Sequence, residues 1–427
     1  MSFANFGLST EILKALKEKQ YLNPTPIQTK SIPLILQGKD IIATAQTGTG
    51  KTAGFVLPML ELLKRGVKAK SNQARSLILA PTRELAIQLG ENASQYGRFL
   101  SLRTIVVYGG VKINPQMMSL RKGTDILIAT PGRLIDLYHQ NAVKFPQLEI
   151  LILDEADRML DLGFTKDICK ILSLLPSHRQ NLMFSATFSA DVRNLATQLL
   201  KNPVEISVSP ENRTATSIQE WVVPVDKKLK PDLLVELISL YDWTQVLIFT
   251  KTKKGADTLA CFLNTKGLKT TAIHGDKNQA ARIKALSDFK NGVTAILIAT
   301  DVAARGLDIA KLQQVINFDL PTIAENYIHR IGRTGRAGLS GQAVSLVSAD
   351  EFTELHEIEV LIKRVLPRKI IDGFEPNHNV PGSELAKKPK KPKKPKKPSL
   401  SKNILDTKKD KGLDLQPRVP PSFSNRR

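Results

Sequence analysis

The chain has 427 residues, which exceeds what one hydrophobic core usually serves, so two globular domains and an additional segment are expected. Hydrophobic residues make up 42% of the sequence and charged residues 24%, a composition that excludes a wholly disordered chain. Lys and Arg number 62 against 40 Asp and Glu, and the resulting formal charge of +22 favours nucleic acid as the partner.

Cysteine usage and hydropathy narrow the class further. Cys169 and Cys261 form no CxxC pair, which argues against a disulfide framework and a zinc site. We expect both to be inert core thiols in a reducing compartment. The amino terminus has no charged segment followed by an apolar run, and no stretch approaches the roughly 18 apolar residues that span a bilayer. The prediction is a cytoplasmic protein that has no membrane contact.

Short runs of β-branched and aliphatic residues recur along the chain and are typical of strands that are buried on both faces. They cover residues 40–44, 76–80, 125–129, 149–153, 245–249, 295–299 and 314–318. Segments with helical spacing lie between them, for example residues 84–89 and 281–289. The alternation predicts the α/β class, with parallel sheets that are flanked by helices.

Domain limits follow from a repeat and from shifts in composition. Residues 126–130 and 296–300 have the same sequence, Ile-Leu-Ile-Ala-Thr, which either a duplicated domain or chance produces. Residues 209–217 are polar and typical of a linker. The predicted units are a first domain at residues 1–208, a second domain at residues 218–371 and a disordered basic tail at residues 372–427.

The predicted tail contains four copies of Lys-Lys-Pro at residues 387–398. Proline at every third position favours polyproline II, which places the lysines along two stripes. Three roles stay open for such an arm: a tether for RNA, a nuclear signal or a solubilising segment.

The first chemistry-bearing motif in chain order is Ala45-Gln-Thr-Gly-Thr-Gly-Lys-Thr52, between a predicted strand and an apolar helical run. Glycines in this context let backbone N–H groups face phosphate oxygens. Lys51 is expected to reach the β and γ phosphates of a nucleotide, and Thr52 to bind magnesium. The alternative is an ordinary Gly-rich turn, and Ala45 stands where the general pattern has Gly.

Two carboxylates, Asp154 and Glu155, directly follow the predicted strand at residues 149–153. Ionised carboxylates at the end of a buried strand need a cation nearby. We expect Asp154 to hold Mg2+ and Glu155 to orient and deprotonate the attacking water, since phosphoryl transfer depends on positioning and charge neutralisation. Capping of the following helix is the structural alternative.

The third motif, His329-Arg-Ile-Gly-Arg-Thr-Gly-Arg336, contains three arginines at three-residue spacing. Arg333 and Arg336 are typical of arginine fingers, which neutralise the γ phosphate only when two domains close on one nucleotide. From these residues alone, a basic helix face that binds RNA phosphate is equally compatible.

These motifs, in this order and spacing, resemble the DEAD-box RNA helicases over residues 1 to about 371. The resemblance rests on residues 24–28, 45–52, 81–86, 109–110, 130–133, 154–157, 185–187, 279–282, 300–308 and 329–336. The phrasing of residues 110–118 and 139–143 is similar to the bacterial RhlE-type subgroup. Gln20 stands where many relatives have Gly, which is a small departure.

The resemblance implies tandem RecA-like domains and an RNA-stimulated ATPase that unwinds short RNA duplexes locally and remodels ribonucleoproteins. The alternatives are an ATP-gated RNA clamp and a DNA helicase. Residues 24–28 disfavour the DNA helicase, because this motif accompanies RNA enzymes. ATP and Mg2+ are the implied cofactors. RNA is the implied partner, bound through its backbone and 2′-hydroxyls without sequence preference. Ribosomal precursors or the RNA-decay machinery would be its targets, and the core would be monomeric.

The resemblance also assigns site residues. Gln28 would read the adenine edge, and Phe3 would stack on the base. The full set of implied nucleotide contacts is Phe3, Gln28, Ala45, Gln46, Thr47, Gly48, Thr49, Gly50, Lys51, Thr52, Asp308, Arg333 and Arg336. Coupling between nucleotide state and domain closure would rest on Ser185 and Thr187, a motif that hydrogen-bonds to Asp157. The implied RNA contacts are Arg83, Gly109, Gly110, Thr130, Arg133, Thr250, Arg282, Thr300 and Gly306.

Overall fold

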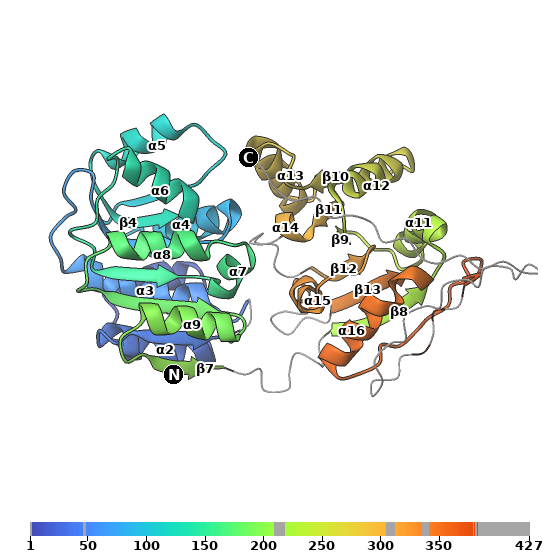
Figure 1. The fold of residues 1–427 in the computed structure, drawn as a ribbon, viewed down its shortest axis with the longest axis horizontal. Coiled ribbons are helices and arrows are strands. Elements are labelled where there is room, and N and C mark those ends of the chain that lie inside the picture. Colours follow the sequence, from blue (N-terminus) through green and yellow to red (C-terminus); the bar gives the residue numbers. More distant parts are fainter. Residues whose placement is uncertain are drawn as a thin grey trace, which may run out of the picture. The chain divides into compact units, whose positions relative to one another are not determined.

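The computed structural model describes residues 2–45, 48–208, 218–304, 312–334, 341–378, 380 and 382. Two parallel sheets with helices on both faces organise these residues (Figure 1). The predicted α/β class is confirmed: each predicted strand coincides with an observed one, and both predicted helical segments lie inside longer helices. The predicted linker, the Lys-Lys-Pro repeats and five predicted site residues lie outside the described residues: Gln46, Thr47, Gly306, Asp308 and Arg336.

The first sheet has seven parallel strands in the order β3-β4-β2-β5-β6-β1-β7. These strands are β1 (Ile41–Thr44), β2 (Ala74–Leu79), β3 (Thr104–Val107), β4 (Thr124–Ala129), β5 (Ile150–Leu153), β6 (Gln180–Ser185) and β7 (Val204–Ser207). Strands β2, β4 and β5 are buried along their whole length, as their continuous apolar runs predict.

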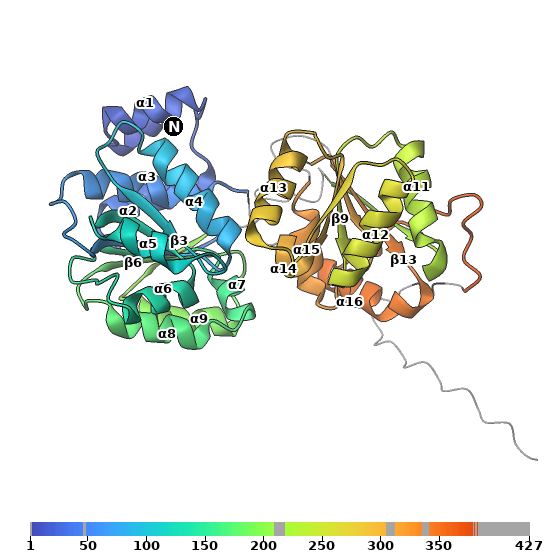
Figure 2. The same ribbon diagram turned by 90° about the horizontal axis from the view of Figure 1, so that it is seen from above.

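Helices cover both faces of the first sheet (Figure 2). One face carries η1 (Phe3–Phe6), α1 (Thr10–Glu18), α2 (Pro26–Leu36), α3 (Lys51–Lys64) and α4 (Arg83–Tyr96). The other carries α5 (Ile113–Leu120), α6 (Pro131–His139), α7 (Ala156–Asp161), α8 (Thr165–Leu174) and α9 (Ala190–Leu199). Each face therefore has its own hydrophobic cluster.

The second sheet has six parallel strands in the order β10-β11-β9-β12-β13-β8. They are β8 (Ile218–Pro224), β9 (Val246–Thr250), β10 (Thr270–Ile273), β11 (Ile296–Thr300), β12 (Gln314–Asn317) and β13 (Gly341–Val347). The helices are η2 (Lys227–Leu229), α11 (Lys230–Leu240), α12 (Lys253–Thr265), α13 (Gln279–Lys290), α14 (Asp301–Ala304), α15 (Ala324–Ile331), η3 (Ala349–Glu351) and α16 (Phe352–Ile362).

Side chains at the amino ends of several helices explain where these helices begin. Thr82 accepts a hydrogen bond from the Leu85 N–H at 3.3 Å and starts α4. Asn278 accepts one from the Ala281 N–H at 2.8 Å and starts α13. Such caps satisfy N–H groups that lack a partner within the helix. Each of these helices carries a predicted RNA contact in its first turn.

The repeated pentapeptide occupies the same place in both sheets. Strand β4 lies second from the β3 edge of the first sheet, and β11 lies second from the β10 edge of the second sheet. Thr130 and Thr300 therefore stand at equivalent strand ends. This equivalence favours duplication over chance as the source of the repeat.

Ordered structure extends beyond the predicted end of the second domain at Ile371. Phe374 packs against the cluster that α11 and α12 form, and Val380 is 5% exposed in the cluster that α15 and α16 form. Arg368 donates to the Val380 carbonyl oxygen at 2.6 Å. The prediction of a disordered tail from residue 372 is therefore wrong for residues 372–378, which the apolar side chains anchor.

Both cysteines lie on the surface, so the prediction of core thiols is wrong. In α8, Ile168 and Ile171 face the core, and Cys169 is turned about 100° away from Ile168 around the helix. Cys261 lies between the buried residues of α12 in sequence but faces solvent for the same reason. Within the described ranges, no helix combines the length and apolarity needed to cross a membrane.

Candidate nucleotide and RNA sites

The predicted phosphate loop and the predicted carboxylates meet at one edge of the first sheet because β5, β6 and β1 are parallel neighbours. Asp154 follows β5, Ser185 ends β6 and Ala45 follows β1. The Ala45 N–H donates to the Ser185 carbonyl oxygen at 3.1 Å. The carboxyl edge of a parallel sheet is the usual place for ligands in α/β folds.

The phosphate loop is shaped by glycines and closed by its lysine. Gly48 and Gly50 have φ values of 85° and 90°, a region that favours glycine. Gly50 is the N-cap of α3, so the first N–H groups of this helix are available for an anion. Lys51 is 7% exposed, and its Nζ donates to the Ala45 carbonyl oxygen at 2.7 Å. A phosphate bound at this loop would replace the Ala45 carbonyl oxygen as the partner of the Lys51 ammonium group.

The amide of Gln28 joins α2 to the phosphate loop. Its Oε1 accepts from the Thr25 N–H at 2.9 Å, and its Nε2 donates to the Gly50 carbonyl oxygen at 3.0 Å. An adenine could therefore bond only to the second Nε2 hydrogen and to the remaining lone pair of Oε1. Phe3 is 3% exposed and packs edge-on to Phe6, so its predicted stacking on the base stays a prediction.

Asp154 is a buried carboxyl group at the end of β5. Burial raises the pKa of Asp154 to about 7, against the opposing effect of the Lys51 ammonium group. A divalent cation would compensate the charge of the buried carboxylate, and carboxylate and hydroxyl oxygens suit Mg2+. In the described parts of the chain, no group of three or more His, Cys, Asp or Glu could hold a metal. Asp154 and Thr52 would supply a carboxylate and a hydroxyl oxygen to such an ion.

Glu155 adopts a left-handed backbone conformation, with φ 51°, at the turn from β5 into α7. Its Oε2 atom is buried and has no hydrogen-bond partner among the described residues. The Arg158 Nη1 atom lies 3.6 Å from this oxygen. An unusual backbone conformation together with an unsatisfied buried acceptor is typical of a functional residue.

Asp157 connects the first turn of α7 to the segment after β6. Its Oδ2 accepts from the Ala186 N–H at 3.1 Å, the Thr187 N–H at 2.9 Å and the Thr187 hydroxyl at 3.1 Å. The predicted bond between Thr187 and Asp157 is therefore present. Ser185 makes no such bond: its Oγ is buried with no hydrogen-bond partner in the described part of the chain, because Ser185 still belongs to β6.

Three predicted RNA loops meet at the other half of the same sheet edge, after β3, β4 and β2. The Thr130 N–H donates to the Val107 carbonyl oxygen at 3.2 Å. Arg133 donates through Nη2 to the Val111 carbonyl oxygen at 2.9 Å. In addition, the Arg83 guanidinium lies against Gly110, where a Cβ atom would come within 2.1 Å of Nη1. The predicted RNA residues of the first sheet thus form one polar surface.

The predicted RNA residues of the second sheet lie at its carboxyl edge and in α13. Thr250 and Thr300 end β9 and β11 and are register partners. Arg282 lies in the first turn of α13, the helix that Asn278 caps. Arg333 is 7% exposed, and its N–H donates to the Arg330 carbonyl oxygen at 3.2 Å.

The sequence alone suggested no role for Arg330 or Asp301, although both lie in motifs that carry the family resemblance. The structure places them in a part-buried bidentate ion pair. The three-residue spacing of the arginines in residues 329–336 could have indicated this role for Arg330. In the structure, the first of these arginines lies on the buried side of α15. Its partner could not be identified without the fold.

Two family models match the chain. The model for DEAD/DEAH box helicases matches residues 25–195, and the model for the helicase conserved C-terminal domain matches residues 229–338. The DEAD-box ATP-dependent RNA helicase CshA of Geobacillus kaustophilus is 42% identical over 367 residues, which cover 86% of this chain and 78% of that protein. The chain belongs to the DEAD-box ATP-dependent RNA helicases.

Further relatives place this helicase within the family. The DEAD-box ATP-dependent RNA helicase RhpA of Helicobacter pylori is 42% identical over 355 residues, covering 83% of this chain and 71% of that protein. Among solved structures, S. cerevisiae Dbp5 bound to RNA and ADP BeF3 matches with a TM-score of 0.77 and 32% identity. The match covers 87% of this helicase and 96% of that chain.

Gly110→Ala should weaken RNA binding by this helicase about tenfold. The added Cβ would displace the Arg83 guanidinium, and an alanine at φ 78° is strained by roughly 1–2 kcal/mol. RNA affinity at fixed salt concentration is the measurement. Gly38→Ala is the matched control, since Gly38 has φ 75° but no atom within 4 Å of the place that an added Cβ would take. Equal affinities for the two variants would contradict a role for Arg83.

Proposed function

We propose that this RNA helicase hydrolyses ATP with Lys51, Asp154 and Glu155 of the first domain and with Arg333 and Arg336 of the second. The observation that carries the proposal is the convergence of the phosphate loop, Asp154 and Glu155 at adjacent strand ends. We also propose domain limits at residues 1–208 and 218 to about 382, with residues 209–217 as the linker.

Each proposed nucleotide-binding or catalytic residue of the first domain has one chemical task. Gly48 to Thr52 bind the phosphates through backbone N–H groups. The Lys51 ammonium group leaves the Ala45 carbonyl oxygen and donates instead to the β and γ phosphates. Thr52 and Asp154 hold Mg2+, whose charge offsets that of the phosphate oxygens. Glu155 orients the attacking water and accepts its proton. Its Oε2, which makes no hydrogen bond with the described residues and pairs with Arg158 only at 3.6 Å, is suited to this task.

RNA binding in this proposal uses backbone contacts of two surfaces, one on each domain. Arg83, Gly110, Arg133 and their neighbours supply the first, and Thr250 and Thr300 the second. ATP and RNA both favour closure of the domains, so each raises the affinity of the other by the same factor. Closure bends one RNA strand, which a continuous A-form duplex does not follow, and a few base pairs open locally.

The finer assignments are proposals of the same kind. We place the protein in the cytoplasm as a monomer that acts on ribosomal precursors or in RNA decay. The RhlE-type subgroup is supported by the phrasing of residues 110–118 and 139–143, whereas the relatives named above are CshA and RhpA proteins. Gln28 and Phe3 are the proposed adenine contacts.

Strand displacement under multiple turnover tests the proposed function. A short RNA duplex should be unwound with ATP, and single-stranded RNA should stimulate ATP hydrolysis far more than DNA of the same sequence. Binding of RNA that depends on ATP but is not accompanied by unwinding would instead establish a clamp. Equal stimulation by RNA and DNA would overturn the RNA assignment.

A further inference from the structure

Arg330 forms several side-chain contacts at the carboxyl edge of the second sheet. It is 2% exposed and lies on α15. Its Nε and Nη2 atoms donate to the two carboxylate oxygens of Asp301 at 2.6 and 2.7 Å. The guanidinium also lies 5.0 Å from the centre of the Phe249 ring. A planar guanidinium is the group that fits this bidentate and stacked geometry.

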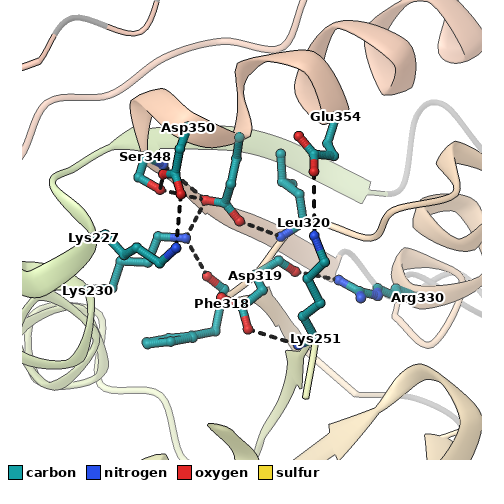
Figure 3. A network of polar contacts seen from close by, with 11 residues as sticks. Lys227, Lys230, Lys251, Phe318, Asp319, Leu320, Arg330, Ser348, Asp350 and Glu354 are labelled. Carbon is teal, nitrogen blue, oxygen red and sulfur yellow. Dashed lines mark hydrogen bonds and ion pairs between the residues drawn. The ribbon is translucent and has the colours of Figure 1, made fainter.

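The remaining nitrogen of Arg330 reaches the end of β12. Nη1 donates to the Asn317 Oδ1 atom at 3.1 Å and to the Asp319 carbonyl oxygen at 2.6 Å. Asp319 in turn accepts a hydrogen bond from the Lys251 N–H through Oδ2 at 2.8 Å. Figure 3 shows Arg330, Asp319 and Lys251 in this line. Arg330 is therefore joined to β9, β11 and β12 by polar contacts or ring stacking.

Lys230 and Glu351 bond to the residues on either side of Asp319. Lys230 is 1% exposed, and its Nζ donates to the Phe318 carbonyl oxygen at 2.8 Å (Figure 3). The Leu320 N–H donates to Glu351 at 3.0 Å, and Glu351 pairs with Lys230 at 2.5 Å. Asp319 is held in place between Arg330 and Lys251, because hydrogen bonds fix the residues before and after it, Phe318 and Leu320.

Two predicted RNA contacts lie one residue away from these partners of Arg330. Thr300 precedes Asp301, and Thr250 follows Phe249, whose ring the Arg330 guanidinium faces. On the other side, the Arg333 N–H donates to the Arg330 carbonyl oxygen at 3.2 Å, so the turn that carries Arg333 begins at Arg330. One side chain therefore connects both RNA positions to the proposed arginine finger.

We propose that Arg330 is a positioning residue that couples RNA bound at Thr250 and Thr300 to the placement of Arg333 at the nucleotide. The proposal rests on the function proposed above for Arg333. Movement of the strand ends on RNA binding shifts Asp301 and Asp319, and Arg330 passes this shift to α15.

Arg330→Lys is the first test, because lysine keeps the charge but cannot bond Asp301 at two atoms and Asp319 together. The measured quantity is the factor by which a non-hydrolysable ATP analogue raises RNA affinity. We expect this coupling factor to fall by about tenfold, within the usual range of such couplings. Asp301→Asn, a smaller change, should lower it in the same direction if Arg330→Lys does not fold.

Lys227→Ala is the matched control, since Lys227 forms an exposed ion pair with Asp350 at 2.9 Å in the same domain (Figure 3). Thermal unfolding of every variant reports the structural effect separately. Unchanged coupling in a folded Arg330→Lys or Asp301→Asn protein would overturn the inference, as would an equal loss in Lys227→Ala. Arg333→Gln separates the two proposals: full ATP hydrolysis by that variant would refute the finger, whatever Arg330 does.

Discussion

Glu155→Gln should lower steady-state ATP hydrolysis by about a hundredfold or more, with ATP affinity largely retained. A positioned general base contributes on the order of 10²–10⁴ in rate, and glutamine keeps the size of the side chain but not its basicity. The buried Oε2, which has no hydrogen-bond partner among the described residues, is the atom at stake. RNA-stimulated phosphate release is the measurement, with nucleotide binding followed in parallel.

Asp161→Asn provides the control for this substitution. Asp161 is an exposed carboxylate at the end of α7, the helix that Glu155 caps. Its neutralisation changes the charge of the same helix without touching the site, so hydrolysis should stay near the rate of the unchanged protein. If Glu155→Gln were equally active, another group would have to serve as the base.

The strand ends that build the nucleotide site were predictable because a parallel sheet brings all its carboxyl ends to one edge. The apolar runs at residues 40–44 and 149–153 identified β1 and β5, and the polar residues that follow them had to lie along that edge. The sequence did not show that β6 lies between these strands, and this arrangement places Ser185 beside Thr44.

Individual side-chain contacts were less predictable, because they depend on a residue's place relative to the strand end. Ser185 and Thr187 differ by two positions, yet only Thr187 has left β6 and reaches Asp157. The end of the second domain was missed for a related reason. Phe374 and Val380 are isolated apolar residues in a polar stretch, and only the fold reveals the clusters that receive them.

One departure from the family pattern has a physical explanation in the structure. Gln20 has φ 58°, in the left-handed region that costs glycine nothing but strains other residues. The family resemblance implies glycine at this position, just after α1. The backbone conformation is therefore set by the turn between α1 and α2, and the side chain of Gln20 is tolerated there.

Asp157→Ala should reduce RNA strand displacement by about tenfold to a hundredfold. The substitution removes the acceptor of three hydrogen bonds and leaves the N–H groups of Ala186 and Thr187 without it. Ala186 is half-buried and Thr187 is exposed, so water partly replaces the lost acceptor and the cost lies below the roughly 1–3 kcal/mol of a fully buried donor. The segment after β6 would then no longer be tied to α7, which directly follows the proposed catalytic residues Asp154 and Glu155. Displacement of a short duplex and ATP hydrolysis should be measured on the same samples.

Two milder variants show which bond of this group matters. Thr187→Val removes only the hydroxyl bond, worth about 0.5–1.5 kcal/mol, so displacement should fall a few-fold. Ser185→Ala should leave displacement unchanged, because its Oγ bonds to nothing in the described part of the chain. A larger loss in Ser185→Ala than in Thr187→Val would mean that Ser185 acquires its partner only in the RNA-bound, ATP-bound state. Asp157 would then be joined to β6 through a second hydroxyl group.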